Sequence, residues 1–312
     1  MLRRAVFAAL LILLVSSAAL VLARLAPPDD GFGTDPAVLR AERERAGLNL
    51  PLAEQYIAWL KQTLHFDFGQ SLRFRRPVAA LVRERAGNTA LLGFSALTLA
   101  TAIGVPLGVF TGSRHGGLLV AVARGGSILL LSVPPLITSL LLLLIAARTG
   151  WLPAGGLPPP VPPDAGVLEA VSVTLRHLCL PSLALALPIA ASLERLQSHS
   201  MREALAEPCI LAALARGVPK GRVIWRHALR LSLKPVLAIY GITIGGVLSG
   251  SFAVEVVMSW QGLGDLMYEA LKGRDLYLVA GCAAAGSACL AAGILLSDVA
   301  LAVVDPRVEE PA

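Results

Sequence analysis

The sequence predicts an all-α membrane protein with six transmembrane helices. Of its 312 residues, 55% are hydrophobic and 15% are charged, whereas a soluble domain carries about 25% charged residues. The mean hydropathy is +0.70. Apolar runs of the length that a helix needs to cross a bilayer recur along the chain. A basic segment at residues 194–235 interrupts them, and loops rich in Lys and Arg remain on the cytoplasmic side.

The first predicted helix occupies residues 5–26, after a short basic tip. A cleaved signal peptide also begins with a basic tip, but this apolar run is long for a signal. Arg24-Leu25-Ala26-Pro27 is also a poor cleavage site. We therefore expect residues 1–26 to form an uncleaved span with a cytoplasmic N-terminus. Residues 27–88 are polar and follow as a periplasmic domain, because a loop of this length is translocated largely regardless of its charge.

The second span is predicted at residues 89–111, and it runs into the pattern Gly104-x-x-x-Gly108-x-x-x-Gly112. Small residues at this spacing let two helices approach closely in lipid, so we interpret them as a packing face. The third span is predicted at residues 125–147, with Pro134 and Pro135 in its middle. Paired prolines remove backbone donors and break the helix, which is tolerated at membrane depth only against protein or a cavity. They indicate either a kink or a position that lines a pore.

The fourth span is predicted at residues 167–193, interrupted by Pro181 and Pro188, and it leads into the basic segment. The fifth span follows at residues 236–258 and the sixth at residues 277–304. Six spans return the C-terminus to the cytoplasm and place the basic segment there as well. The span count and the charge distribution are separate arguments, and they agree.

Two acidic residues, Glu255 and Asp298, are the charges most deeply embedded in the predicted spans. A carboxylate inside a membrane is a candidate for function. Both residues lie near predicted span ends, where a charged side chain can also reach the interface. Glu255 is therefore retained, with Pro134 and Pro135, as a possible part of a translocation pathway or gate.

The basic segment contains a short stretch of small residues, Ala212 to Ala215, followed by Arg216, Gly217 and Pro219. Gly tolerates the left-handed conformation that ends many helices, and a nearby Pro cannot continue one. The pattern predicts a short helix whose small side chains would let a partner approach closely. A solvated basic connector is the alternative interpretation.

The sequence lacks the motifs of an enzyme. It has no GxxxxGK[ST] phosphate-binding loop, no HExxH and no GxSxG, and its four cysteines show no metal-like spacing. We expect no catalytic residue, no cofactor, no metal site and no ATP hydrolysis by this chain. Because the basic residues lie mostly in loops, we expect anionic lipid headgroups rather than nucleic acid as their partners.

Short motifs in a defined order resemble one family of transport proteins. The chain resembles an inner-membrane permease subunit of a binding-protein-dependent ABC importer, in the dipeptide/oligopeptide/nickel branch, and the first of that branch's two permease types. The motifs are Gln55-Tyr56-x-x-Trp59-Leu60, Asp67-Phe68-Gly69-x-Ser71-Leu72, Arg76-Pro77-Val78, Gly150-Trp151-Leu152-Pro153-Ala154-Gly155-Gly156, His177-Leu178-x-Leu180-Pro181, Ala213-x-Ala215-Arg216-Gly217, Arg226-His227-Ala228-Leu229-Arg230, Lys234-Pro235, Ser259-Trp260-x-Gly262-Leu263-Gly264, Arg274-Asp275 and Asp305-Pro306-Arg307.

The resemblance implies a permease core at residues 89–312, with an EAA-type coupling loop at about 198–234. In such importers the EAA helix sits in a cleft of a cytoplasmic ATPase, and ATP-driven closure of two ATPases switches two permeases between inward and outward access. The implied partners are a second permease, two ATPases that bind ATP-Mg, and a periplasmic or lipid-anchored substrate-binding protein. The implied location is the bacterial inner membrane.

Residue by residue, the resemblance assigns the close-packing face of the coupling helix to Ala213, Ala215 and Gly217, and a charged ATPase contact to Arg216. Leu214 departs from the polar or charged residue that these loops commonly carry, which puts part of that contact in doubt.

The sequence leaves two questions open. An ion-coupled secondary transporter is the alternative function, although such a carrier would show inverted repeats, and none is evident here. The cargo is also open among peptides, glutathione-like molecules, nickel chelates and opines.

Overall fold

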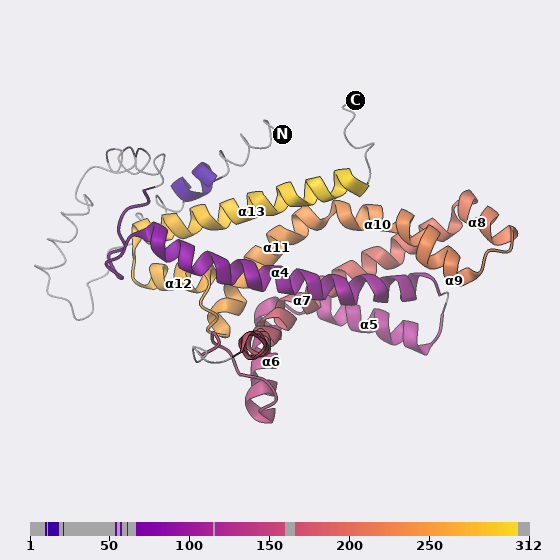
Figure 1. Ribbon diagram of the computed structural model, residues 1–312, viewed down its shortest axis with the longest axis horizontal. Coiled ribbons are helices and arrows are strands. Elements are labelled where there is room, and N and C mark those ends of the chain that lie inside the picture. The colour runs from indigo at the N-terminus through magenta and orange to yellow at the C-terminus, as the bar shows by residue number, and fades with distance from the viewer. Residues whose placement is uncertain are drawn as a thin grey trace, which may run out of the picture. The chain divides into compact units, whose positions relative to one another are not determined.

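The computed structural model describes residues 67–114, 116–159 and 166–304, with side chains up to residue 297, and residues 10, 12–18, 21, 54, 57 and 61 before them. These residues are largely helical, and no β-strand occurs among them beyond an isolated bridge between Gln70 and Pro77. Figure 1 shows the helices in chain order. They are α4 (Val78–Gly112), α5 (Leu118–Ser132), α6 (Pro135–Thr149), α7 (Val167–Ala206), α8 (Pro208–Ala215), α9 (Lys220–Arg222), the π-helix η1 (Val223–Ala228), α10 (Leu229–Ala238), α11 (Tyr240–Val257), α12 (Leu263–Lys272) and α13 (Leu276–Val304).

Four described helices are long and apolar enough to cross a membrane: α4, α7, α11 and the Leu276–Ser297 part of α13. The pair α5 and α6 adds a fifth if it counts as one broken span. These helices make the chain a multi-pass membrane protein of the all-helical class. The predicted span at residues 5–26 lies largely outside the described residues, so the count of six stays a prediction, as does the periplasmic placement of residues 27–88.

In the first half of the chain, one predicted boundary differs from the structure and one predicted break is confirmed. Helix α4 begins at Val78 rather than at residue 89. Its first turns carry Arg83, Glu84 and Arg85, which hid the helix from an apolar window, but Val78 and Leu81 in the same turns are buried. The break predicted at the paired prolines is confirmed, because α5 ends at Ser132, α6 begins at Pro135, and the two helices meet at 108°. Pro135 occupies the first turn of α6, where its missing N–H needs no partner.

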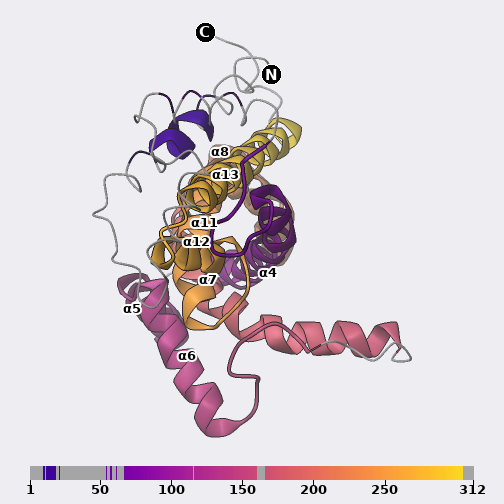
Figure 2. The same cartoon turned by 90° about the vertical axis from the view of Figure 1, so that its left-hand side faces the viewer.

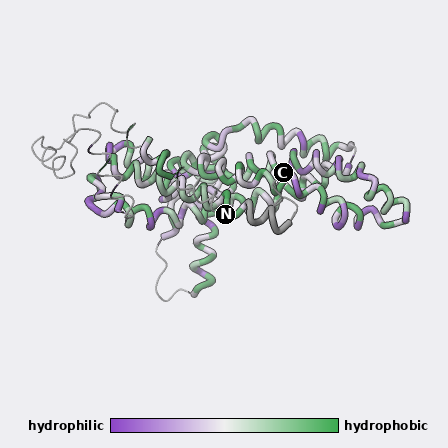
Figure 3. The backbone as a smooth tube through the Cα atoms, turned by 90° about the horizontal axis from the view of Figure 1, so that it is seen from above, coloured by the Kyte–Doolittle hydropathy of each residue, from purple (hydrophilic) through white to green (hydrophobic). Residues whose placement is uncertain are grey.

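The fourth predicted span was wrong at its end and in its interruption. Helix α7 runs unbroken through Pro181 and Pro188 and continues to Ala206. Neighbouring helices re-satisfy the backbone groups that a proline frees in a membrane helix, and Pro181 is buried. The polar residues 194–206, predicted as the start of a loop, are therefore helix. Figure 3 shows hydrophilic and apolar residues interspersed in the region of α8 and α9.

The chain divides into two compact units. One comprises residues 67–90 and 261–291 of the described chain, and the other comprises residues 91–260 and 292–304. In the first unit, Asp275 is fully buried immediately before α13. Its carboxylate accepts hydrogen bonds from the Leu278 N–H at 3.2 Å and from the Ser71 hydroxyl at 2.6 Å. Asp275 thus caps the helix and ties it to the turn that precedes α4.

In the second unit, α4 packs on α7 through its three glycines. A Cβ at Gly104 would lie 2.5 Å from the carbonyl oxygen of Ala190, and one at Gly112 would lie 2.6 Å from that of Ser198. Gly108 faces α7 in the same way. The two helix backbones touch directly along this row, which confirms the predicted packing face. Figure 2 looks along α4, with the first part of α7 seen from the side.

Gly108→Ala should destabilise the protein. The added Cβ would lie 2.6 Å from the Cβ of Gln197 and 2.7 Å from the carbonyl oxygen of Glu194, and backbone cannot give way cheaply. We expect a loss of about 1–3 kcal/mol, the usual cost of overpacking, measured as a lower thermal unfolding midpoint in detergent. Gly125→Ala in α5 is the matched control, since a Cβ there meets nothing within 4 Å. Equal midpoints for the two variants would contradict the close contact.

Candidate functional site

The short helix α8 ends in a complete helix stop. The Gly217 N–H donates to the Leu214 carbonyl at 2.9 Å, and the Val218 N–H donates to the Ala213 carbonyl at 3.2 Å. This pair of bonds is a Schellman motif. Gly217 has φ +80°, a left-handed conformation that costs glycine little. The predicted end of the helix is thereby confirmed. Pro208 occupies the first turn, where proline is favoured, so both ends of α8 are set by local sequence.

The inner face of α8 packs into a core that joins three elements. Ile210 and Ala213 are buried, at 3% and 6% exposure, against Met201 and Ala204 of α7 and Val223 of η1. Leu214 and Val218 are partly buried against the same core. The core holds α8 firmly to the end of α7.

The outer face of α8 is exposed and made of small or apolar residues. Pro208, Leu211, Ala212 and Ala215 are exposed, and their spacing of i, i+3, i+4 and i+7 places them on one side of the helix. Leu211 is 52% exposed. We call these four residues the outer face of α8. An apolar helix face that the described part of the chain leaves exposed is suited to contact with another protein.

The structure separates the residues that the sequence grouped as a coupling site. Ala215, Arg216 and Gly217 are exposed, whereas Ala213 belongs to the inner core. Leu214, the residue that departs from the family pattern, turns toward that core as well. Sequence reasoning did not single out Pro208 or Leu211, which lie on the outer face of α8. The i, i+3, i+4, i+7 series that starts at Pro208 was the signal that could have found them.

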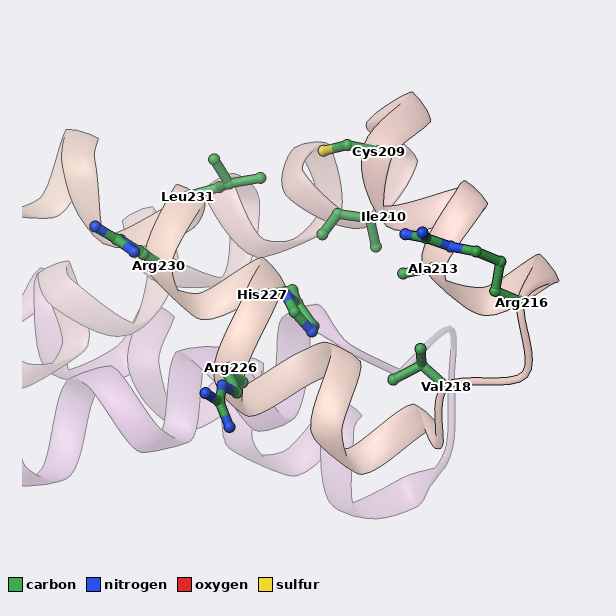
Figure 4. Close-up of a pocket in the computed structure, with 9 residues that line it drawn as sticks. All are labelled: Cys209, Ile210, Ala213, Arg216, Val218, Arg226, His227, Arg230 and Leu231. Atoms are coloured by element: carbon green, nitrogen blue, oxygen red, sulfur yellow. The ribbon is translucent and has the colours of Figure 1, made fainter.

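A basic hollow lies beside α8, with a volume of about 800 Å³. Figure 4 shows Arg216 reaching back along α8 and His227 pointing into the space between α8 and η1. No acidic residue is among those that line it, so the hollow favours an acidic or anionic neighbour. The lining residues are Cys209, Ile210, Ala213, Arg216, Val218, Arg226, His227, Arg230 and Leu231.

The π-helix η1 aligns a row of exposed basic side chains next to this hollow. Arg222, Arg226 and Arg230 are exposed and four residues apart. In an α-helix of 3.6 residues per turn, each step of four drifts forward by about 40°. A π-helix closes i→i+5 bonds and has wider turns, so the same step drifts backward there. By this geometry the three residues lie on one side of the segment.

The candidate pathway residues lie in the second unit but are not gathered at one point. Pro134 is exposed. Pro135 packs near α11, since a Cβ on Gly250 would lie 3.6 Å from its ring. Glu255 is fully buried farther along α11, and its carbonyl oxygen accepts the Trp260 N–H at 2.9 Å. The side chain of Asp298 lies outside the described residues.

The sequence matches a known family of membrane transport proteins over most of its length. Residues 104–310 match the family described as "Binding-protein-dependent transport system inner membrane component". The chain belongs to this family of membrane permeases. Within the family it is a permease of the peptide ABC importer branch, as its relatives indicate.

Three relatives illustrate the similarity. The chain is 33% identical over 293 residues to a Brucella suis protein named as a peptide permease, covering 91% of this chain and 89% of the relative. It is 30% identical over 314 residues to the oligopeptide transport system permease protein AppB of Bacillus subtilis, covering 98% of each. It is 31% identical over 290 residues to the oligopeptide transport system permease protein OppB of Salmonella typhimurium, covering 91% and 90%.

Gly217→Ala should loosen the end of α8. Alanine at φ +80° brings its Cβ against the backbone at a cost of about 1–2 kcal/mol. We expect the Gly217 and Val218 amides, which form the helix stop, to exchange their hydrogens about tenfold faster in hydrogen-exchange measurements. Gly221→Ala is the matched control, because Gly221 lies in α9 without a positive φ and without a neighbour within 4 Å. Unchanged exchange in Gly217→Ala would contradict the assigned helix stop.

Proposed function

We propose that this chain is the permease subunit that receives the work of ATP hydrolysis through α8. The observation that carries the proposal is the exposed outer face of α8, formed by Pro208, Leu211, Ala212 and Ala215. Its partner is a cytoplasmic ATPase subunit, which docks against this small-residue face, while Arg216 and Gly217 lie at its edge. Ala213 supports the face from behind by anchoring α8 in its core.

A push on α8 would travel along α7. The shared core of Ile210 and Ala213 with Met201 and Ala204 leaves little room for α8 to move alone, because packed interiors transmit displacement rather than absorb it. Helix α7 has 40 residues, which is about 60 Å measured along its bent axis at 1.5 Å per residue. It therefore links the docking surface to the part of the chain that spans the membrane.

The complete importer contains this chain, a second permease, two ATPase subunits that bind ATP-Mg, and a substrate-binding protein that delivers the cargo. This chain has no ATPase site of its own and lies in the inner membrane with both termini in the cytoplasm. The cargo is a peptide or a similar small solute, in line with the oligopeptide transport named for the relatives AppB and OppB. The basic segment contacts anionic lipid headgroups at the cytoplasmic surface of the membrane.

Pro134, Pro135 and Glu255 are proposed to border the pathway or its gate. The support for this is the 108° break between α5 and α6 together with a buried carboxylate on the helix that α6 approaches. Broken helices are tolerated at membrane depth where they line a cavity or lie against protein.

Transport in vesicles tests the energy source. Proteoliposomes that contain both permeases and both ATPases should take up a peptide only with ATP and the loaded binding protein, and an ionophore should not abolish uptake. Uptake that follows an ion gradient without ATP would instead support the alternative, an ion-coupled secondary transporter.

Ala215→Trp should block docking of the ATPase. A bulky indole on the exposed outer face of α8 holds the partner away, so we expect recovery of the ATPase with the affinity-purified permease to fall at least tenfold, measured by co-purification. Ala154→Trp serves as the matched control, because Ala154 is also exposed but lies in the loop after α6. Equal ATPase recovery with both variants would place the docking surface elsewhere.

A further inference from the structure

A buried carboxylate in α7 has one oxygen without a partner. Glu194 is 1% exposed, and its Oε1 accepts a hydrogen bond from the Thr111 hydroxyl at 2.5 Å. Its Oε2 is buried and meets no hydrogen-bond donor in the described part of the chain. A buried carboxylate is normally paired with a cation or fully hydrogen-bonded, so this arrangement leaves Glu194 incompletely satisfied.

A partly buried arginine in α5 has one donor without an acceptor in the described structure. Arg124 donates from Nη2 to the Thr111 carbonyl at 2.7 Å, and its Nε is buried without an acceptor among the described residues. Thr111 of α4 thus contacts the acid through its hydroxyl and the base through its carbonyl. Glu194 Oε2 lacks a donor and Arg124 Nε lacks an acceptor in the described structure. Both side chains bond Thr111, but no bond between them is present in this part of the chain.

The polar face of α7 offers further acceptors within one turn. Gln197 Oε1 and Ser198 Oγ are also buried without partners in the described structure, and these residues lie three and four positions after Glu194, on the same side of the helix. A guanidinium has five N–H donors. Arg124 therefore carries enough donors to serve several of these oxygens.

We infer that Glu194 and Arg124 form a latch with two arrangements, bridged by Thr111 in this structure and directly paired when α7 is displaced through α8. The inference rests on the proposed function, because the displacement comes from the ATPase. Gly104, Gly108 and Gly112 hold α4 against the backbone of α7, so these two helices move together, and the displacement is against α5, which carries Arg124. Sliding between packed helices with two discrete contacts is a common form of conformational switch.

Glu194 is therefore a positioning residue for coupling, and a double-mutant cycle tests it. The variants are Glu194→Gln, Arg124→Gln and the double variant, each in the complete importer. The readout is the ratio of ATP hydrolysis with and without the loaded binding protein. We expect each single change to lower this ratio about fivefold or more, the usual scale of coupling between sites, and the double variant to be no worse than the poorer single one. Glu169→Gln is the control, since Glu169 is an exposed carboxylate on the same helix, and it should keep the wild-type ratio.

Unfolding midpoints of the wild type, the two single variants and the double variant distinguish a latch from a passive brace. A passive brace is a contact that only stabilises the fold. A brace would make the stabilities of the two single variants non-additive while leaving the stimulation ratio at the wild-type value, and that result would overturn the latch. Single effects on the ratio that multiply in the double variant would overturn it too. If Glu194→Gln is not recovered folded, Glu194→Asp with Arg124→Lys retains both charges at shorter reach and should lower the ratio without loss of assembly. If the loaded binding protein does not change the rate of ATP hydrolysis by the wild-type importer, the proposed function itself is contradicted. That result is seen before any variant is compared.

Discussion

The direct backbone contact between α4 and α7 is the constraint on which the second unit depends. Gly104, Gly108 and Gly112 meet the backbone of α7 at intervals of four residues, so the two helices are in register over two turns. In lipid no hydrophobic effect drives helices together, and close van der Waals contact takes its place. The contact fixes where α7 lies, and α7 in turn determines where α8 is held.

The apolar runs were enough to locate the long helices, but not their ends. Arg83, Glu84 and Arg85 made the start of α4 look like a loop, although Val78 and Leu81 bury the opposite side of the same turns. Polar residues hid the end of α7 in the same way. Hydropathy averages over all sides of a helix, so it misses a helix that is buried along one side and charged along another.

The candidate site was predictable in its chemistry and unpredictable in its orientation. Gly217 and the proline after it specify the end of α8 through backbone geometry, which is local. The choice between Ala213 and Ala215 is different, because two alanines in one short helix show no hydrophobic contrast. Only the packing of Ile210 against α7 and η1 decides which alanine faces inward. The unsatisfied oxygen of Glu194 was likewise invisible, because it depends on neighbours more than 80 residues away in the chain.

The π-helix η1 makes the spacing of this loop sensitive to chain length. A π turn amounts to an α-helix with one residue too many, so the loss of a single residue between Val223 and Ala228 would let the segment relax to α geometry. Everything after the deletion would then rotate by about 100°, the angle of one residue in an α-helix. Arg230 would swing away from Arg222, and α11 would enter the membrane with a different side facing its neighbours. We therefore expect substitutions in this segment to be better tolerated than insertions or deletions. The length of the loop determines the orientation of α10 and α11 and matters as much as its charge.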